Sequence, residues 1–398
     1  MRIKETLQAF SLLSILGIIY VSFLSCTGHG HETREMAAQS TVNVRMAAEP
    51  SARYKDFILQ IKELRLATQD GKDTRTLKVD QSFTLPAQTG HDAPAELLKG
   101  QNIPPKEYRL VSIVLDPRTE KNSVTLASGL PRPLVVPDAV TVQLEGLPQG
   151  SKTSRTYDIR IVLDTDRSIQ RTRVDGSEAQ DRFTLRPSLR AVDASSTGSI
   201  KGKLTNGEGA PQKDVLVTAQ IAQGGDEGVV RCTRTDALGN YSLDLLPGSR
   251  TYHLVTLPEF GPQGGIKAQI VKEQPLTTPA EVPVQGEAPL EPASASGTLR
   301  GTIHRTVNAA EHDEVEVLQE LPLPGGKSTR RVVVHRLLPM LSADGAESSF
   351  EIKLPAGRYQ VRPARVSVTA GRPASRNLDF QRLDCEVKPD ETHSLDLR

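Results

Sequence analysis

The sequence has no tryptophan, and aromatic residues make up only 4% of its 398 positions. Aromatic platforms that stack on sugars or on nucleic-acid bases are therefore scarce. Neither sign of charge dominates, because 49 Lys and Arg face 48 Asp and Glu. No basic field is available to attract nucleic acid, so we expect no nucleic-acid partner.

Motifs of common catalytic chemistry are also missing. The chain has no HExxH, no CxxC pair and no Gly-x-Ser-x-Gly. Residues 325–328 (GGKS) end like a phosphate loop, but the first glycine of that motif would fall at Leu321. We predict a surface hairpin there. The sequence therefore predicts no enzymatic activity and no cofactor.

Cysteine occurs three times, at Cys26, Cys232 and Cys385. A disulfide is chemically allowed outside the cytoplasm. The last two cysteines lie in what we predict to be different domains, and we favour two buried free thiols that pack as small hydrophobic groups.

An apolar run near the N-terminus ends at the first cysteine. Arg2 and Lys4 precede about 13 mostly apolar residues, 12–24, and the run closes in Leu24-Ser25-Cys26. A helix that crosses a bilayer needs about 20 apolar residues. The length fits the apolar core of a signal peptide, residues 1–25, better than a membrane span.

This ending resembles the lipobox of bacterial lipoproteins, with Phe23 where that family usually has Leu. The resemblance implies that the Cys26 sulfur takes a diacylglyceryl group and that the new amino terminus is acylated. Several acyl chains hold a protein stably to a membrane, whereas one does so marginally. Thr27, in place of Asp, favours the outer membrane. We expect a lipid-anchored bacterial cell-envelope protein, and ordinary secretion or a retained membrane helix are the alternatives.

Residues 26–40 are small and polar, and we predict a flexible tether. His29 and His31 lie in it without the other ligands of a closed metal site. From residue 41 to 193, β-branched and apolar residues recur with period two, which is typical of half-buried strands. One short helix is predicted at Pro94–Lys99, before Gly100.

The region 41–193 is similar to an uncharacterised domain of bacterial lipoproteins. The similarity rests on VNVRM with FILQIKELRLAT, on IPPKEYRLVSIVLD, and on YDIRIVLDTDRSI followed by FTLRPSLRAV. Ser168 lies one residue early against the family's spacing. The family implies a β domain of the cell envelope and no established activity.

Residues 197–271 form a second predicted unit around TDALGNYSLDLLPGSRTYHL. Turns at 236–240 and at Pro247-Gly248 separate alternating apolar residues. This pattern resembles the carboxypeptidase regulatory-like, transthyretin-like β-sandwich, with two extra residues between Gly248 and Tyr252.

A Pro-rich segment, 272–296, follows, and we expect an extended linker that buries no core. Residues 297–398 are predicted to form a second transthyretin-like sandwich. GTLRGTIHRTV echoes GSIKGKLTNGE, and LPAGRY repeats the turn before the tyrosine, so the two units look like divergent copies. The predicted fold class is all-β, with tandem β-sandwich modules.

One polar run places oxygen side chains at calcium-loop spacing. Asp164, Asp166 and Ser168 are the metal candidates, with Asp175 at the twelfth position. Ile169 occupies the place where such a loop requires glycine, and Arg167 adds positive charge. We favour an ordinary polar strand end and expect no metal.

Two functions fit these observations. The first is a non-enzymatic, lipid-anchored binding or scaffold protein with a membrane contact and an envelope partner. The second is an accessory glycan-binding lipoprotein of a polysaccharide uptake system. The second needs an exposed aromatic platform, for which Tyr54, Tyr108 and Tyr157 are the candidates.

Overall fold

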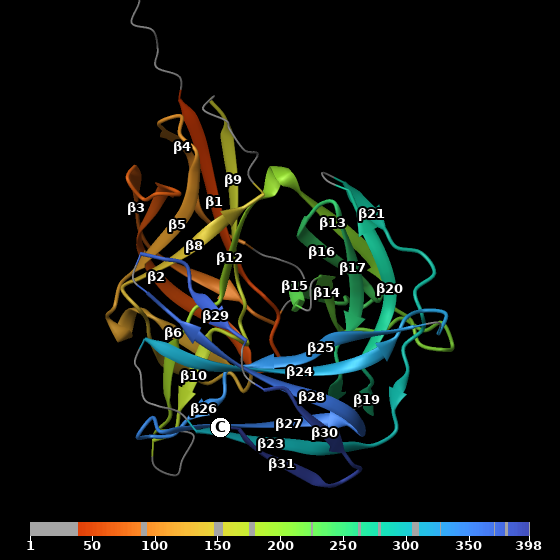
Figure 1. The fold of residues 1–398 in the computed structure, drawn as a ribbon. Helices are drawn as coiled ribbons and strands as arrows, with labels where there is room; N and C mark the ends of the chain where they lie inside the picture. The colour runs from red at the N-terminus through yellow and green to blue at the C-terminus, as the bar shows by residue number, and fades with distance from the viewer. Residues whose placement is uncertain are drawn as a thin grey trace, which may run out of the picture. The chain divides into compact units, whose positions relative to one another are not determined.

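The computed structural model is built almost wholly of strands (Figure 1). It describes residues 39–88, 94–146, 154–174, 180–223, 226–261, 264–277, 280–304, 310–326, 328–369, 371–378 and 381–397. Residues 39–398 form one unit by their contacts. In the described residues no helix is long and apolar enough to cross a membrane. The all-β, tandem-sandwich prediction is confirmed.

Three sandwiches follow one another along the chain, and each has the same seven core strands. In sandwich 1 these are β1 (Ser40–Ala48), β2 (Tyr54–Thr68), β3 (Thr74–Pro86), β4 (Ala95–Ile103), β5 (Tyr108–Leu115), β8 (Ala139–Glu145) and β9 (Thr156–Leu163). In sandwich 2 they are β13 (Thr197–Lys203), β14 (Leu216–Gln223), β15 (Asp226–Arg234), β16 (Asn240–Pro247), β17 (Arg250–Thr256), β20 (Gln269–Leu276) and β21 (Glu281–Pro283). In sandwich 3 they are β23 (Ser296–His304), β24 (Glu311–Pro322), β25 (Thr329–Leu337), β27 (Glu347–Pro355), β28 (Gly357–Ser367), β30 (Leu383–Val387) and β31 (Thr392–Leu397).

The pairing of these strands is the same three times. The first strand pairs antiparallel with the fourth and parallel with the last, as in β1 with β4 and β9, β13 with β16 and β21, and β23 with β27 and β31. The second strand pairs with the third and fifth, and the fifth pairs with the sixth. The sequence predicted two copies of one unit, whereas the topology shows three.

A tyrosine at the start of the fifth strand explains the repeated turn. The hydroxyls of Tyr108, Tyr252 and Tyr359 donate to the carbonyl oxygens of Pro104, Pro247 and Pro355, at 3.4, 2.5 and 2.7 Å. Each bond ties the end of the fourth strand to the next strand and satisfies a buried phenol. IPPKEY in sandwich 1 has the same proline–tyrosine spacing as LPAGRY in sandwich 3.

Glycines in the first strand account for the GSIKGK and GTLRGT echo. A Cβ at Gly202 would overlap the ring of Tyr241, and one at Gly301 would overlap the ring of Phe350. Each ring lies on the opposite strand, because Gly202 pairs with Tyr241 and Gly301 with Phe350. The glycine therefore makes room for a buried aromatic residue in both sandwiches.

Ten further strands are added to the seven core strands of the three sandwiches. They are β6 (Ser123–Leu126), β7 (Pro131–Val135), β10 (Ile169–Thr172), β11 (Arg182–Leu185), β12 (Leu189–Asp193), β18 (Glu259–Gly261), β19 (Gly264–Ile266), β22 (Pro292–Ala293), β26 (Met340–Leu341) and β29 (Ser375–Asn377). Single-turn 3-10 segments occur at Thr119–Lys121 and Ala194–Ser196. A parallel bridge of β10 with β26 makes one 16-stranded sheet continuous between sandwiches 1 and 3.

Three apolar clusters form the cores. One fills sandwich 1, and another fills sandwich 2. The third joins sandwich 3 to four residues of sandwich 2, namely Val255, Leu257, Ala268 and Ile270. Sandwiches 2 and 3 therefore share apolar packing, which stabilises their contact.

Two local predictions are wrong. Pro94–Lys99 is not a helix, because residues 95–103 form β4 and pair antiparallel with β1. The segment 272–296 is not an extended linker, because β21 pairs with β13 and β22 with β19. Val284 and Leu290 are buried in the core of sandwich 2. In both places, pairing with a distant strand overrides the local preference.

Candidate functional site

A junction of charged side chains lies where the three sandwiches meet. Strands β1 and β9 are parallel, and Ala48 pairs with Leu163. Glu49 and Asp164 therefore leave the same edge of the sheet side by side, and the Glu49 amide donates to the Leu163 carbonyl at 2.8 Å. Both carboxylates belong to sandwich 1.

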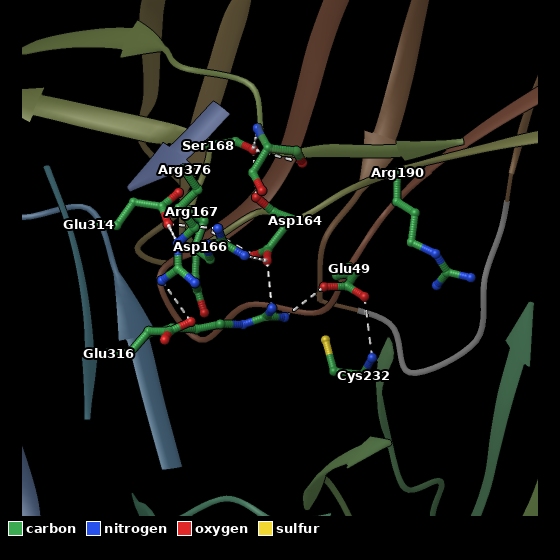
Figure 2. A network of polar contacts seen from close by, with 12 residues as sticks. Glu49, Asp164, Asp166, Arg167, Ser168, Arg190, Cys232, Glu314, Glu316 and Arg376 are labelled. Carbon is green, nitrogen blue, oxygen red and sulfur yellow. Dashed lines mark hydrogen bonds and ion pairs between the residues drawn. The ribbon is translucent and has the colours of Figure 1, made fainter. Parts of the chain in front are cut away.

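Arg336 of β25 binds both carboxylates, and Figure 2 labels the two acceptors, Glu49 and Asp164. Its Nη2 lies 3.0 Å from Glu49 Oε2, and its Nη1 lies 2.8 Å from Asp164 Oδ2. Glu49 Oε1 also accepts from the Cys232 amide at 3.2 Å and from Arg231 at 3.4 Å, both on β15. Only 6% of the Glu49 side chain and 10% of the Arg336 side chain are exposed. One carboxylate thus connects sandwich 1 to both others.

A second group of charges continues into sandwich 3. Arg167 donates to Glu314 Oε2 at 2.6 Å, and Arg376 reaches Glu314 and Glu316, each at 2.9 Å. The two glutamates lie two positions apart on β24, so they point to the same face of the strand. Arg362, which is 1% exposed, binds Glu316 Oε2 at 2.6 Å. Every carboxylate here faces an arginine, as buried charges require.

Hydrogen bonds between side chains and backbone groups also join the sandwiches. The Gln220 side chain donates to the Val333 carbonyl at 2.7 Å and accepts from the Val333 amide at 2.8 Å. Arg190 of β12 donates to the Val230 carbonyl at 2.8 Å and to the Leu245 carbonyl. The three sandwiches are therefore joined by directional contacts.

Burial shifts several protonation equilibria in this region. It raises the pKa of Asp164 to about 6, against the pull of Arg336. It lowers the pKa of His335 to about 4, helped by Arg53, and it lowers the pKa of His312 to about 4. Burial alone would raise the pKa of Glu314, but Arg167 and Arg376 bring it below its ordinary value.

These shifts have opposite effects on stability. In the folded state the pKa values of His335 and His312 lie below the unfolded value near 6.5. The stability that these histidines contribute is therefore complete above pH 6.5 and is lost as the pH falls toward 4. The Asp164 pKa rises above the unfolded value near 4. Its contribution is present below that value and is lost as the pH rises through about 6.

The free energy of unfolding of the wild type should fall between pH 7 and pH 4.5. In His335→Gln we expect this fall to be smaller by about 2 kcal/mol. The variant lacks a neutral imidazole that must be protonated on unfolding. Urea unfolding at both pH values measures the difference. His393→Gln, a half-exposed control on β31, should follow the wild type. Parallel pH profiles for the wild type and His335→Gln would contradict the assignment.

The metal candidates take part in this network. Asp164 binds Arg336, and Asp166 Oδ1 accepts from Ser51 at 2.7 Å and from Arg53 at 3.2 Å. The Ser168 hydroxyl donates to the Asp164 carbonyl at 2.6 Å. The run is the polar connection between β9 and β10. In the described residues no group of three or more His, Cys, Asp or Glu could hold a metal ion. Asp175 lies outside those residues.

The remaining candidates have separate outcomes. Cys26, His29 and His31 lie outside the described residues. Cys232 and Cys385 are buried free thiols, as predicted. Burial raises the pKa of Cys385 to about 11 and that of Cys232 well above its ordinary value, so neither is a ready nucleophile.

The prediction that Tyr54, Tyr108 and Tyr157 form an exposed aromatic platform is wrong. Tyr54, Tyr108 and Tyr157 are 4%, 2% and 1% exposed and lie in the core of sandwich 1. Their period-two positions place them on the inward face of their strands. The GGKS run connects the antiparallel strands β24 and β25, which confirms the hairpin, although Lys327 lies outside the described residues.

A cleft of about 1400 Å³ opens beside the charged junction, and all three sandwiches line it. Glu49, Asp164, Arg336 and Cys232 contribute to it from the junction. Phe260 and Arg234 line it from sandwich 2, where Arg234 binds Glu259 at 2.6 Å. No local sequence pattern indicates this cleft, because its lining residues come from distant parts of the chain.

One protein-family model matches the region of the first sandwich. Residues 39–187 match DUF4382, a domain of unknown function. The match fits the expected β domain of unknown function, and the matched residues contain all seven core strands of sandwich 1. No curated protein matches the chain.

Solved structures give distant likenesses. A leucine-rich repeat protein from Bacteroides thetaiotaomicron VPI-5482 is 14% identical with a TM-score of 0.25; the match covers 50% of this chain and 26% of that protein. A streptococcal ancillary pilin is 10% identical with a TM-score of 0.20, over 90% and 99% of the two chains. A DUF3823 family protein from Bacteroides ovatus ATCC 8483 is 12% identical with a TM-score of 0.17, over 48% and 97%. At these scores we draw no functional conclusion from them.

Proposed function

We propose that this chain is a non-enzymatic, lipid-anchored protein of the bacterial cell envelope, in which three joined sandwiches act as one binding or scaffold unit. The observation that carries the scaffold is the junction at Glu49 and Arg336. Tandem modules on free linkers would move independently, whereas here a buried carboxylate binds both neighbouring sandwiches. Such a unit holds a partner at a fixed distance from its anchor.

The anchor rests on the sequence alone. The basic start, the apolar run and Leu24-Ser25-Cys26 support acylation at Cys26 and a location at the outer membrane. The absence of nucleophile–base motifs and the raised pKa values of both described thiols support a non-enzymatic role. The glycan-binding alternative has lost the three tyrosines on which it depended.

Mass spectrometry of the mature N-terminus, combined with membrane fractionation, tests the anchor. We expect acylated Cys26 as the first residue and the protein in the membrane fraction. We expect Cys26→Ser to appear in the soluble fraction, because the acceptor sulfur is gone. Wild-type protein with an unmodified Cys26 thiol, or with residues before Cys26, would overturn the anchor.

A further inference from the structure

Sandwich 1 is held to the other two sandwiches mainly by charged and polar side chains. The residues of its apolar cluster all lie between positions 42 and 191, inside sandwich 1 and its added strands. The apolar cluster of sandwich 3, in contrast, includes four residues of sandwich 2. Charged contacts respond to the proton concentration, whereas apolar packing does not. A fall in pH therefore acts on the contacts of sandwich 1 and leaves the packing between sandwiches 2 and 3 in place.

Two histidines of sandwich 3 face charged groups of sandwich 1. His312 and Glu314 lie two positions apart on β24, so both point to the face on which Glu314 binds Arg167 (Figure 2). His312 is 3% exposed, and its Nδ1 has no hydrogen-bond partner within the described residues. His335 of β25 lines the cleft, as does Arg53 of sandwich 1. Both imidazoles thus lie where sandwich 3 meets sandwich 1.

Arginines of sandwich 1 and carboxylates of β24 surround His312. The charges that act on it are those of Arg167 and Arg186 from sandwich 1 and of Asp313 and Glu314 from its own strand. Both carboxylates are already bound by arginines, in the pairs Asp313–Arg365, Glu314–Arg167 and Glu314–Arg376. A proton on this imidazole therefore adds a cation where the existing arginines already match the carboxylates.

His335 has a similar environment. The charges that act on it are those of Arg53 and Asp166 from sandwich 1 and of Arg336 from β25. Asp166 already accepts from Arg53 at 3.2 Å and from Ser51 at 2.7 Å. A proton on the imidazole therefore places a third cation beside two arginines, opposite one carboxylate that is already paired.

Proton linkage gives the direction of the effect. Burial lowers the pKa of His312 and of His335 to about 4, and exposure to solvent returns each to its ordinary value. Asp164 has the opposite effect, because burial raises its pKa to about 6. Between pH 7 and pH 4.5 each histidine favours an open contact by roughly 50-fold, and Asp164 opposes it by roughly 20-fold. The two histidines together outweigh Asp164, so acid favours opening.

We propose that His312 and His335 form an acid-sensitive latch between sandwiches 1 and 3, which opens when they are protonated while each sandwich keeps its fold. In the open form, sandwich 1 is connected to the paired sandwiches 2 and 3 chiefly by the chain at Ala194–Ser196. The fixed spacing of the three sandwiches is then lost. The latch goes beyond the proposed scaffold role and does not depend on the lipid anchor, so the two proposals fail separately.

Two native thiols report on the latch. Cys232 is 5% exposed, and its amide donates to Glu49 of sandwich 1, so separation of sandwich 1 uncovers it. Cys385 lies in the apolar cluster of sandwich 3, so only unfolding of that sandwich uncovers it. The test labels the Cys26→Ser chain with 4,4′-dithiodipyridine, which reacts with thiols in acid, at pH 7 and pH 4.5. Peptide mass spectrometry identifies the labelled cysteine, and far-ultraviolet circular dichroism follows the strands.

We expect acid to uncover Cys232 alone. Its labelling rate, relative to the urea-unfolded chain at the same pH, should rise at least about tenfold from pH 7 to pH 4.5. Cys385 should stay protected, and the dichroism spectrum should keep its strand signal. Labelling of both thiols together would show general unfolding and overturn the proposal. Protection of Cys232 at pH 4.5 would overturn it as well.

Variants assign the response to the two histidines. In His312→Gln with His335→Gln, the labelling rate of Cys232 should change less than about twofold between the two pH values. His253→Gln is the matched control. His253 is 5% exposed and lies opposite Gln220, whose side chain bonds to Val333, so it faces the contact between sandwiches 2 and 3. This control should keep the wild-type response.

An acid response that persists in the double variant, or that His253→Gln loses to the same extent, contradicts the latch. The comparison of two thiols in the wild type needs no variant, so it decides whether sandwich 1 opens even where the double variant does not fold. His335→Gln alone then tests the assignment, because its side chain lines the cleft. It should reduce the acid response, and an unchanged response would overturn the role of the histidines.

Discussion

Arg336→Met is expected to lower the free energy of unfolding by about 3–5 kcal/mol, because it leaves two carboxylates without their shared cation in a buried place. Glu49 would keep Arg231 at 3.4 Å, and Asp164 would keep Arg167 at 3.7 Å. Neither of these contacts is as short as the ones that are lost, at 3.0 and 2.8 Å. Urea unfolding at pH 7 measures the loss.

The location of increased hydrogen exchange in Arg336→Met distinguishes a weakened junction from a general loss of stability. Hydrogen exchange should rise first at the end of β1, at residues 164–168 and along β25, where the sandwiches meet. Arg300→Met is the control, because Arg300 and Glu351 form a pair in which both side chains are 58% exposed. That change should cost at most about 1 kcal/mol. Equal losses in the two variants would contradict the role of the junction.

Local sequence patterns predicted most of the fold. The alternation in Tyr157–Leu163 gave β9, and the turn at 236–240 gave the connection before β16. The predicted helix at Pro94–Lys99 is wrong, because the helix signals are local, whereas the segment pairs with β1, which is distant in sequence. The predicted linker at 272–296 is wrong for the same reason, since its prolines lie beside short stretches that pair with other strands.

The sequence does contain a signal that sandwich 1 is a copy of the same unit as the other two. IPPKEY precedes β5 with the same proline–tyrosine spacing as LPAGRY before β28, and both tyrosines bond to the proline carbonyl. Additional strands in sandwich 1 hide the likeness along the sequence. Strand pairing reveals it, because the seven core strands keep their partners.

The junction could not be read from local patterns. Glu49 and Arg336 lie 287 positions apart. Strand β24 did carry a sign, because EHDEVEV places charged residues on both faces of a strand. Such a run usually indicates solvated residues, yet Asp313, Glu314 and Glu316 are all buried. Arginines from distant parts of the chain, such as Arg167, Arg362 and Arg376, compensate the charges of the buried glutamates.

The pair of Arg362 and Glu316 inside sandwich 3 provides the second large effect. Arg362 Nε and Nη2 lie 3.0 and 2.6 Å from Glu316 Oε2, and both side chains are buried. Arg362→Met should cost about 3–5 kcal/mol, because among the described residues Glu316 would keep only Arg376 as a partner. Urea unfolding of the full chain measures the cost.

The double variant Arg362→Met with Glu316→Leu is expected to recover most of that loss. Replacing a buried ion pair by apolar groups of similar volume is often neutral or stabilising, since neither charge then has to leave water. Arg376 would keep Glu314 at 2.9 Å, so the double change leaves no cation isolated. A double variant whose loss equals the sum of the two single losses would show that the charges do not act as a pair. Recovery would mean that this pair specifies the arrangement of β24 and β28 rather than supplying its stability.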